Sequence, residues 1–188
     1  MKKIFSIIIV CLCTISYCIC YSACVNANLS DNLLRFHIIA NSDSDYDQNV
    51  KFAVRDYVSK NLAQDGDLVS DSQRLANEYL SNSGIGYTAK ATEEYVFIPK
   101  KRYNNIALPS GNYRAIRLIL GEGTGKNWWC VAYPKLCFCE ATNGKISQDG
   151  MDKLKKSLNN EGFCIIADDK CLRFKIVDIT NSILEKIN

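Results

Sequence analysis

Residues 33–62 read LLRFHIIANSDSDYDQNVKFAVRDYVSKNL, and their pattern decides the fold. The mostly apolar run at 33–39 predicts a buried first strand. Residues 41–45 form a polar turn rich in side chains that cap helices. From 50 to 62 the apolar residues recur every three or four positions, which places them on one helical face. The stretch therefore predicts a strand, a capped turn and an amphipathic helix in succession.

The remainder of the chain predicts further strands and helices around this unit. Strands are predicted at 87–98, 112–120, 128–133, 163–166 and 172–177, and helices at 72–80, 148–158 and 179–187. The polar segment 99–109 is interpreted as a connection. The glycines of 121–125 predict a turn that needs positive φ. This order favours a single α+β domain over residues 28–188, with a mainly antiparallel sheet and about four helices.

The N-terminus has the order of an export signal. A basic start, Met1–Lys3, precedes 22 uncharged residues from Ile4 to Val25. Residues 1–27 are therefore interpreted as a signal peptide cut before Asn28, or as an uncut membrane anchor. Lipid attachment at Cys24 is a third alternative. All three place the domain outside the cytoplasm.

The charge distribution limits the classes of partner that the chain could bind. The formal net charge is only +3, although residues 28–99 carry eleven acids against six bases and residues 100–188 carry fifteen bases against nine acids. With export, this balance argues against nucleic acid as a partner. The basic second half is compatible with a membrane surface or an acidic partner. The single histidine excludes any site that needs two histidine ligands from one chain.

Five cysteines lie beyond the export segment, an odd number. Cys130 and Cys137 flank a turn that contains a proline, and they form one candidate disulfide. Cys164 and Cys171 form another candidate if a hairpin brings two strands together between them. The alternative for all of them is a buried free thiol.

Two groups of residues suggest chemistry that has a simpler explanation. His37 and Cys130 could form a base and a thiolate nucleophile in a cell-wall enzyme, helped by Arg114 or Arg117. The alternative is that His37 is a packed residue of a buried strand. Asn41, Asp43, Asp45 and Asp47 suggest a calcium loop, but the glycine and the closing glutamate of such a loop are absent, and capping of the following helix explains these residues more simply.

Trp128 and Trp129 are the only tryptophans, and they are adjacent. Neighbouring residues of a strand point to opposite faces of its sheet. One tryptophan could therefore pack in the core while the other contacts a partner, since exposed tryptophan is a common interface residue. The alternative is that helices cover both.

Two blocks of sequence carry a family resemblance. The first is LRFHIIANSDS at 34–44, and the second is LPSGNYRA at 108–115 followed by GEGTGKNWWCVAYPKLCF at 121–138. Both resemble the stage II sporulation protein R family, as does RFKIV at 173–177. Ser110 and Asn112 depart from the more usual alanine and glutamate. The resemblance covers about residues 30–187.

The resemblance implies a function that composition and residue spacing alone do not predict. It implies a protein exported from the forespore into the space between the forespore and mother-cell membranes. There it activates a membrane-embedded aspartic protease that processes pro-sigma-E. The family implies no catalytic residue and no cofactor. The candidate contact or motif residues are Arg35, His37, Asn41, Asp43, Gly123, Asn127, Trp128 and Trp129.

Overall fold

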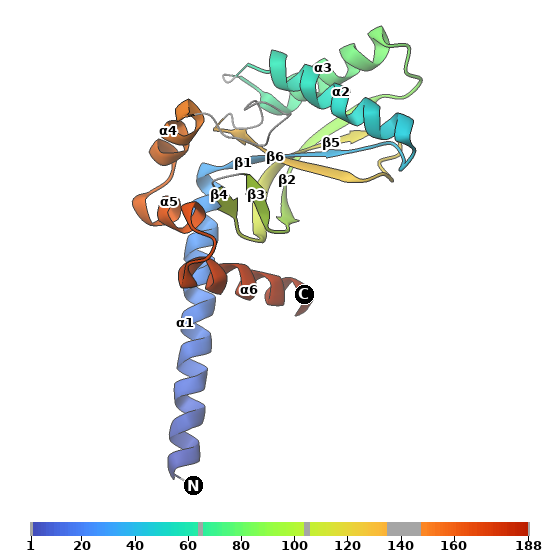
Figure 1. The fold of residues 1–188 in the computed structure, drawn as a ribbon. Helices are drawn as coiled ribbons and strands as arrows, with labels where there is room; N and C mark the ends of the chain where they lie inside the picture. Colours follow the sequence, from blue (N-terminus) through green and yellow to red (C-terminus); the bar gives the residue numbers. More distant parts are fainter. Residues whose placement is uncertain (1, 64–65, 104–105, 135–147, 188) are drawn as a thin grey trace.

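The computed structural model describes residues 2–63, 66–103, 106–134 and 148–187. Within these ranges the chain forms an α+β fold, as predicted from the sequence (Figure 1). In chain order the elements are α1 (Lys2–Asn32), β1 (Leu34–Ile39), α2 (Asp45–Asn61), α3 (Leu68–Asn82), β2 (Ala89–Ile98), β3 (Lys101–Tyr103), β4 (Ile106–Leu108), β5 (Gly111–Leu120), β6 (Asn127–Tyr133), α4 (Gln148–Ser157), α5 (Asn160–Ala167) and α6 (Leu172–Ile187).

A four-stranded sheet in the order β2-β5-β1-β6 forms the centre. Its two outer pairs, β2–β5 and β1–β6, are antiparallel, as expected. The central pair β1–β5 is parallel, which makes the sheet mixed. A separate hairpin, β3–β4, occupies the segment that the sequence pattern marked as a connection.

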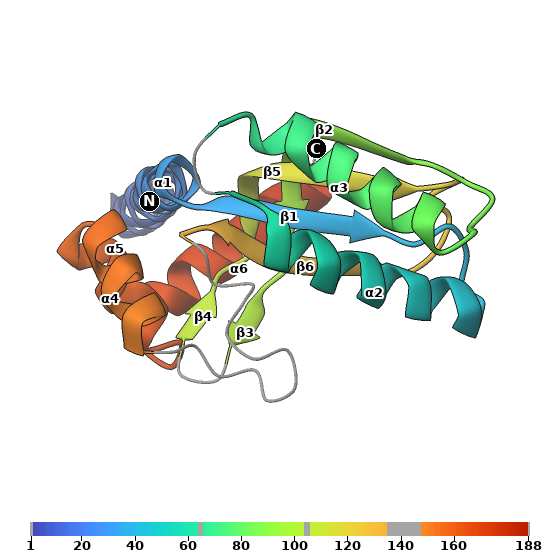
Figure 2. The same cartoon turned by 90° about the horizontal axis from the view of Figure 1, so that it is seen from above.

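Helices α2 and α3 cover one face of the sheet, which we call the α2 side (Figure 2). The periodic apolar face of α2 is buried as predicted, with Val54 and Val58 fully enclosed beside Ile38 of β1. The helix begins at the expected turn, where the Ser44 hydroxyl accepts the amide of Asp47 at 3.2 Å. Such a cap satisfies an amide that has no partner within the helix.

The opposite face of the sheet, which we call the α6 side, packs against the end of α1, the β3–β4 hairpin, α5 and α6. Leu29 of α1, Tyr113 of β5 and Phe174 of α6 meet in one core cluster with no exposed surface. The domain therefore has two apolar layers, one on each face of its sheet.

Two predicted strands in the last third are wrong. Residues 163–166 belong to α5 and residues 172–177 to α6, so the described residues after α1 form five helices, close to the four expected. Asn159 caps α5, because its side-chain oxygen accepts the amide of Gly162 at 2.6 Å. Burial of the apolar face outweighs the strand preference of these β-branched and aromatic residues.

Among the described residues, one helix, α1, is long and apolar enough to cross a membrane. It continues without interruption through Ala27, the residue before the predicted cleavage point, as far as Asn32. Its first part projects from the domain, whereas its last turns pack against the sheet (Figure 1). The division of the chain at residue 27 stays a prediction.

Candidate functional site

Two loops are joined where the parallel strands β1 and β5 end. The amides of Thr124 and Gly125, before β6, donate to the carbonyl oxygens of Asn41 and Ala40 at 3.1 and 3.0 Å. The Asn41 side-chain oxygen accepts the amide of Glu122 at 2.9 Å. We call this connection, formed by residues 40–44 and 121–126, the loop clasp.

The glycines of the loop clasp permit a close approach of two backbones. Gly121 and Gly123 have φ values of +54° and +62°, as predicted for this turn. At Gly125 a side chain would overlap the carbonyl group of Ser42. The glycine-rich pattern is thus explained by backbone geometry, without a bound phosphate.

Asp47 of α2 supports the loop clasp from within. Its carboxylate is almost fully buried and accepts hydrogen bonds from Ser42 at 2.5 Å, Asn41 at 2.9 Å and Tyr87 at 2.7 Å. These donors, Ser42 first, hold the pKa of Asp47 below its ordinary value. The sequence suggested Asp47 for a calcium loop, but its carboxylate instead accepts hydrogen bonds from these three donors, and an acid in the first helical turn also suits the helix dipole.

Asp43 and Lys51 complete the loop clasp. Asp43 accepts the amide of Lys126 at 2.8 Å, and the buried ammonium group of Lys51 donates to the Lys126 carbonyl oxygen at 2.9 Å. Burial lowers the pKa of Lys51. Within the described ranges, no cluster of histidine, cysteine, aspartate or glutamate has an arrangement that could hold a metal ion. Asn41, Asp43 and Gly123 therefore shape the loops.

His37 lies in a separate cluster on the α6 side of the sheet. The ring stacks on Trp129 with centroids 3.5 Å apart, and Nε2 lies 2.9 Å from the side-chain oxygen of Asn127. Only 4% of His37 is exposed, and this burial lowers its pKa to about 4. The ring is therefore neutral near pH 7, with Nε2–H donating to Asn127 and Nδ1 left without a partner among the described residues.

The two tryptophans point to opposite faces, as strand alternation predicts. Trp129 packs against the core cluster of the α6 side, and Trp128 packs against that of the α2 side. The guanidinium carbon of Arg55 lies 5.2 Å from the Trp128 ring centroid, a distance typical of a cation–π contact. Both indole rings are half-buried, so each combines a packing role with some accessible surface.

Arg35 is fully buried and connects strands. Its Nε donates to the Cys130 carbonyl oxygen at 2.9 Å, and Nη2 donates to the Tyr103 hydroxyl at 3.1 Å. Its guanidinium carbon lies 4.9 Å from the ring centroid of Tyr113. Arg35 therefore holds together β1, β6, β5 and the hairpin, and cannot contact a partner without unfolding.

The cysteines do not assemble the predicted dyad. Cys130 is disulfide-bonded, and its side chain belongs to the core cluster of the α2 side, whereas His37 lies on the α6 side. Cys164 and Cys171 are free thiols, so the predicted bridge between them is wrong. Their segment is helical, and no pair of strands brings them face to face. Cys137 lies outside the described residues, so its pairing with Cys130 stays a prediction.

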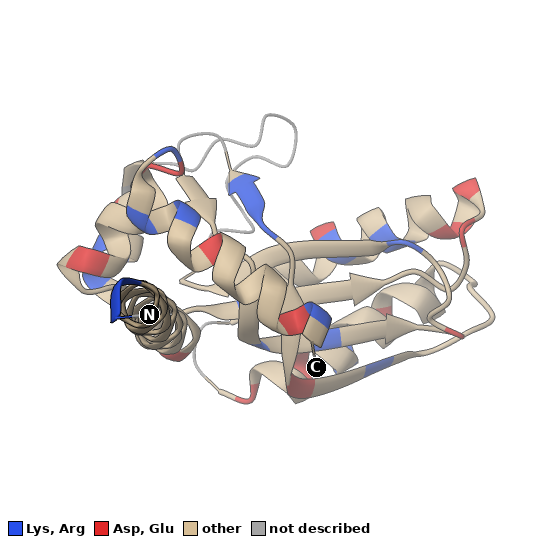
Figure 3. Cartoon of the chain, turned by 90° about the horizontal axis from the view of Figure 1, so that it is seen from below, with Lys and Arg blue, Asp and Glu red and all other residues tan. Residues whose placement is uncertain are grey.

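An ion pair lies beside the His37 cluster, and of its two residues only Arg117 was named from the sequence, as a possible helper of His37. Arg117 of β5 is the register partner of His37, and its Nη1 lies 3.2 Å from a carboxylate oxygen of Glu94 on β2. Strand alternation places Arg117 and Glu94 on the α6 side of the sheet. In the sequence, this ion pair is indicated only by charged residues at alternate positions of two predicted strands. We call the accessible residues Glu94, Arg117, Asn127 and Trp129 the open face, and His37 lies buried beneath it. Figure 3 shows strands beside α6 with no helix in front of them.

Comparisons with known proteins agree on one family. The family described as stage II sporulation protein R matches residues 30–74 and 66–143, a region that includes the loop clasp and the open face. A relative from Bacillus subtilis (strain 168), named "Stage II sporulation protein R", is 34% identical over 139 residues. The match covers 66% of this chain and 62% of that relative, which is less than two thirds of its length. No solved structure matches the chain.

Proposed function

The chain belongs to the stage II sporulation protein R family, and we propose that it is an exported sporulation signal protein that activates a membrane-embedded aspartic protease. The protease would then process pro-sigma-E in the mother cell. In this proposal the chain acts as a ligand that carries out no chemistry itself.

One observation carries the proposal beyond the family name: within the described ranges, no helix covers the strands beside α6 that bear the open face (Figure 3). Trp129, Arg117 and Glu94 are half-buried there, so an aromatic ring and an ion pair remain accessible to a partner. The open face therefore suits a protein partner better than the α2 side, which is covered by two helices (Figure 2).

Activation by such a ligand needs only a difference in affinity. A ligand that binds the active state of a protease more tightly than the inactive state shifts the population toward activity. A hundredfold preference corresponds to about 2.7 kcal/mol. One half-buried aromatic residue and an ion pair at an interface can supply a difference of this size.

The alternative of a cell-wall enzyme that uses Cys130 and His37 receives no support from the geometry. The two side chains lie on opposite faces of the sheet, and a disulfide leaves no thiolate at Cys130. The low pKa of His37 results mainly from burial under Trp129, which also limits the access of a substrate.

A test is cleavage of pro-sigma-E in a non-sporulating host that expresses the candidate protease with or without this chain. The informative variant exchanges the charges of the open face, Glu94→Arg with Arg117→Glu, so that an ion pair can still form. The matched control, Glu93→Arg with Arg114→Glu, exchanges a second β2–β5 pair that is also 3.2 Å apart. Glu93 pairs in register with the buried Ile116, so this control pair lies on the α2 side.

We expect the parent chain to cause cleavage, the exchange on the open face to reduce it about tenfold or more, and the control exchange to change it less than about twofold. Export and folding of each variant are checked by fractionation and protease resistance. Equal activity of both exchanges would exclude the open face as the contact. No cleavage with the exported, folded parent chain would refute the proposed function.

A further inference from the structure

The last turns of α1 are part of the domain core. Ser22, Val25 and Leu29, together with Leu33 directly after the helix, recur at intervals of three and four residues and are buried. The Ser22 hydroxyl donates to the side-chain oxygen of Asn181 on α6 at 2.7 Å. The Ser30 hydroxyl accepts the amide of Arg114 on β5 at 3.1 Å.

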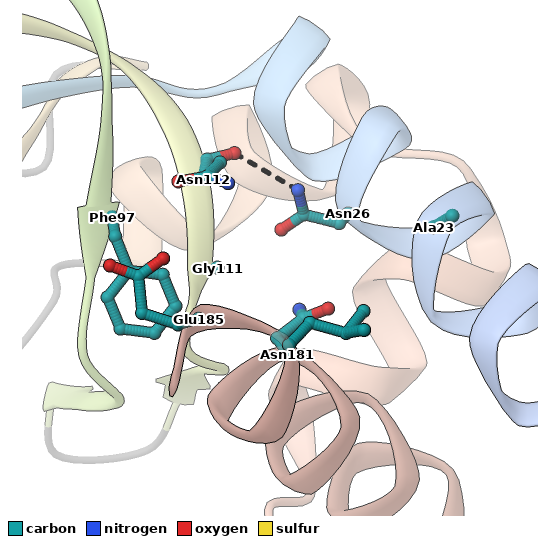
Figure 4. Close-up of a pocket in the computed structure, with 8 residues that line it drawn as sticks. Ala23, Asn26, Phe97, Gly111, Asn112, Asn181 and Glu185 are labelled. Carbon is teal, nitrogen blue, oxygen red and sulfur yellow. Dashed lines mark hydrogen bonds between the residues drawn. The ribbon is translucent and has the colours of Figure 1, made fainter. Parts of the chain in front are cut away.

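A small cavity of about 200 Å³ with both polar and apolar lining residues lies where α1 meets β5 and α6 (Figure 4). Across it the Asn26 amide group donates to the carbonyl oxygen of Asn112 at 3.0 Å. Cleavage after Ala27 would remove Ser22, Val25 and Asn26, and with them part of the core and its hydrogen bonds. This packing favours a helix that is retained after export.

The earlier part of α1 has the character of a membrane span. The apolar residues from Ile4 to Ile15 are exposed, and Lys2 and Lys3 precede them. Residues 4–20 extend about 26 Å along a helix, close to the hydrocarbon thickness of a bilayer. Tyr17 and Tyr21 stack with ring centroids 6.0 Å apart at the domain end of this span, a position where membrane proteins favour tyrosine.

Helix α6 presents an apolar stripe away from the domain. Its inner face contributes Phe174, Val177 and Asn181 to the core and the contact with α1. The opposite face, at helical spacing, bears four strongly exposed apolar residues: Leu172 (71%), Ile179 (57%), Ile183 (52%) and Ile187 (74%). Lys175 and Lys186 flank this stripe, which is the pattern of a helix that lies in a membrane interface.

The position of α6 links this stripe to the membrane span. The Ser22–Asn181 hydrogen bond fixes the crossing of α6 and α1, and the two helices run in clearly different directions (Figure 1). Residues before Ser22 extend beyond the crossing, on the side away from the sheet. The outer face of α6 therefore points toward the plane in which α1 enters the bilayer.

We propose that α1 is retained and that the apolar stripe of α6 lies in the lipid surface where α1 enters the membrane. The occupant of the stripe is the bilayer, with anionic headgroups beside Lys175 and Lys186. Two attachments at an angle would fix the orientation of the domain, which a single helix would leave free to rotate. This inference requires only export and membrane insertion, and it is independent of protease activation.

The test uses the full chain in vesicles of three parts brominated phosphatidylcholine to one part phosphatidylglycerol. Bromine on the acyl chains quenches tryptophan fluorescence on contact. Ile183→Trp adds a probe to the stripe, and Tyr46→Trp adds a matched probe at an exposed residue of α2, on the opposite side of the sheet. The parent chain supplies the baseline from Trp128 and Trp129, and mass spectrometry of protein recovered from the host membrane reports whether residues 1–27 are still attached.

We expect the brominated lipid to remove about half or more of the emission added at position 183 and almost none of that added at position 46. We also expect the recovered protein to have the mass of the uncut chain. Unquenched emission from a folded Ile183→Trp variant would overturn the lipid contact. Blue-shifted but unquenched emission would mean that protein covers the stripe, which also overturns it. A mass that lacks residues 1–27 would overturn retention of α1. The assay contains no protease, so these outcomes leave the proposed function to its own test.

Discussion

Acidification is expected to destabilise the protein through His37. The neutral ring is stacked under Trp129, and burial lowers its pKa from 6.5 to about 4. In the unfolded chain the same ring has an ordinary pKa and binds a proton more readily. Between these two values the unfolded state binds more protons, so the free energy of unfolding must fall as the pH falls.

The magnitude follows from the two pKa values of His37. With 6.5 in the unfolded and about 4 in the folded chain, the loss of stability between pH 7 and pH 5 is about 2 kcal/mol. It approaches about 3 kcal/mol near pH 4 and is complete below it. Well above pH 6.5 the ring is neutral in both states, so His37 no longer makes the free energy of unfolding depend on pH.

Urea unfolding in detergent micelles at pH 7 and pH 5, followed by tryptophan fluorescence, measures this loss. Carboxylates also titrate toward pH 4, so the control is His37→Phe, which keeps an aromatic ring against Trp129 and cannot be protonated. His37 is the only histidine, so its ring signals in NMR give the folded pKa without ambiguity.

We expect the parent chain to lose about 2 kcal/mol more than His37→Phe between the two pH values. Equal losses in the two proteins, or a folded ring that titrates near 6.5, would refute the argument that stacking and burial keep His37 neutral.

Three further predictions concern stability. Leu29→Ala, in the buried part of α1, is expected to lower the free energy of unfolding in urea by about 2–5 kcal/mol. Ile8→Ala, in the exposed part, should change this free energy by less than about 0.5 kcal/mol. Similar losses in the two variants would mean that α1 does not form part of the core. Gly125→Ala should separate the two loops of the loop clasp and lower the melting temperature, and an unchanged melting temperature would contradict the overlap with Ser42. Asp47→Ala leaves three donors without their acceptor, and a cost below about 1 kcal/mol in the same assay would contradict its bracing role.

Local patterns predicted the parts of the fold that depend on neighbours in sequence. Helix α2 followed from the apolar period at 50–62 and the capping residues of the turn at 41–45, and the opposite directions of Trp128 and Trp129 followed from strand alternation. The α+β class followed from the order of such elements.

Contacts between segments that are distant in sequence could not be predicted from local patterns. The parallel pairing of β1 with β5 brings Arg117 beside His37 across 80 positions of sequence, and no local period encodes it. Residues 163–166 of α5 and 172–177 of α6 were predicted as strands because their β-branched and aromatic residues prefer strands, whereas the second half of α6 was predicted as a helix. Burial of the apolar face on the α6 side favours a helix in both segments. Helix α1 has an exposed first part and buried last turns. The spacing of Ser22, Val25 and Leu29 is consistent with a buried helical face, but such a face is hard to recognise within a long apolar segment.

The central claim is that this chain activates a membrane protease without performing chemistry. Its most direct test is pro-sigma-E cleavage by the purified candidate protease in proteoliposomes, with the full chain as the only added component. We expect cleavage to require both proteins, to rise with the amount of this chain, and to persist with His37→Phe. Cleavage that proceeds equally without the chain, or that appears with the chain in the absence of the protease, would contradict it.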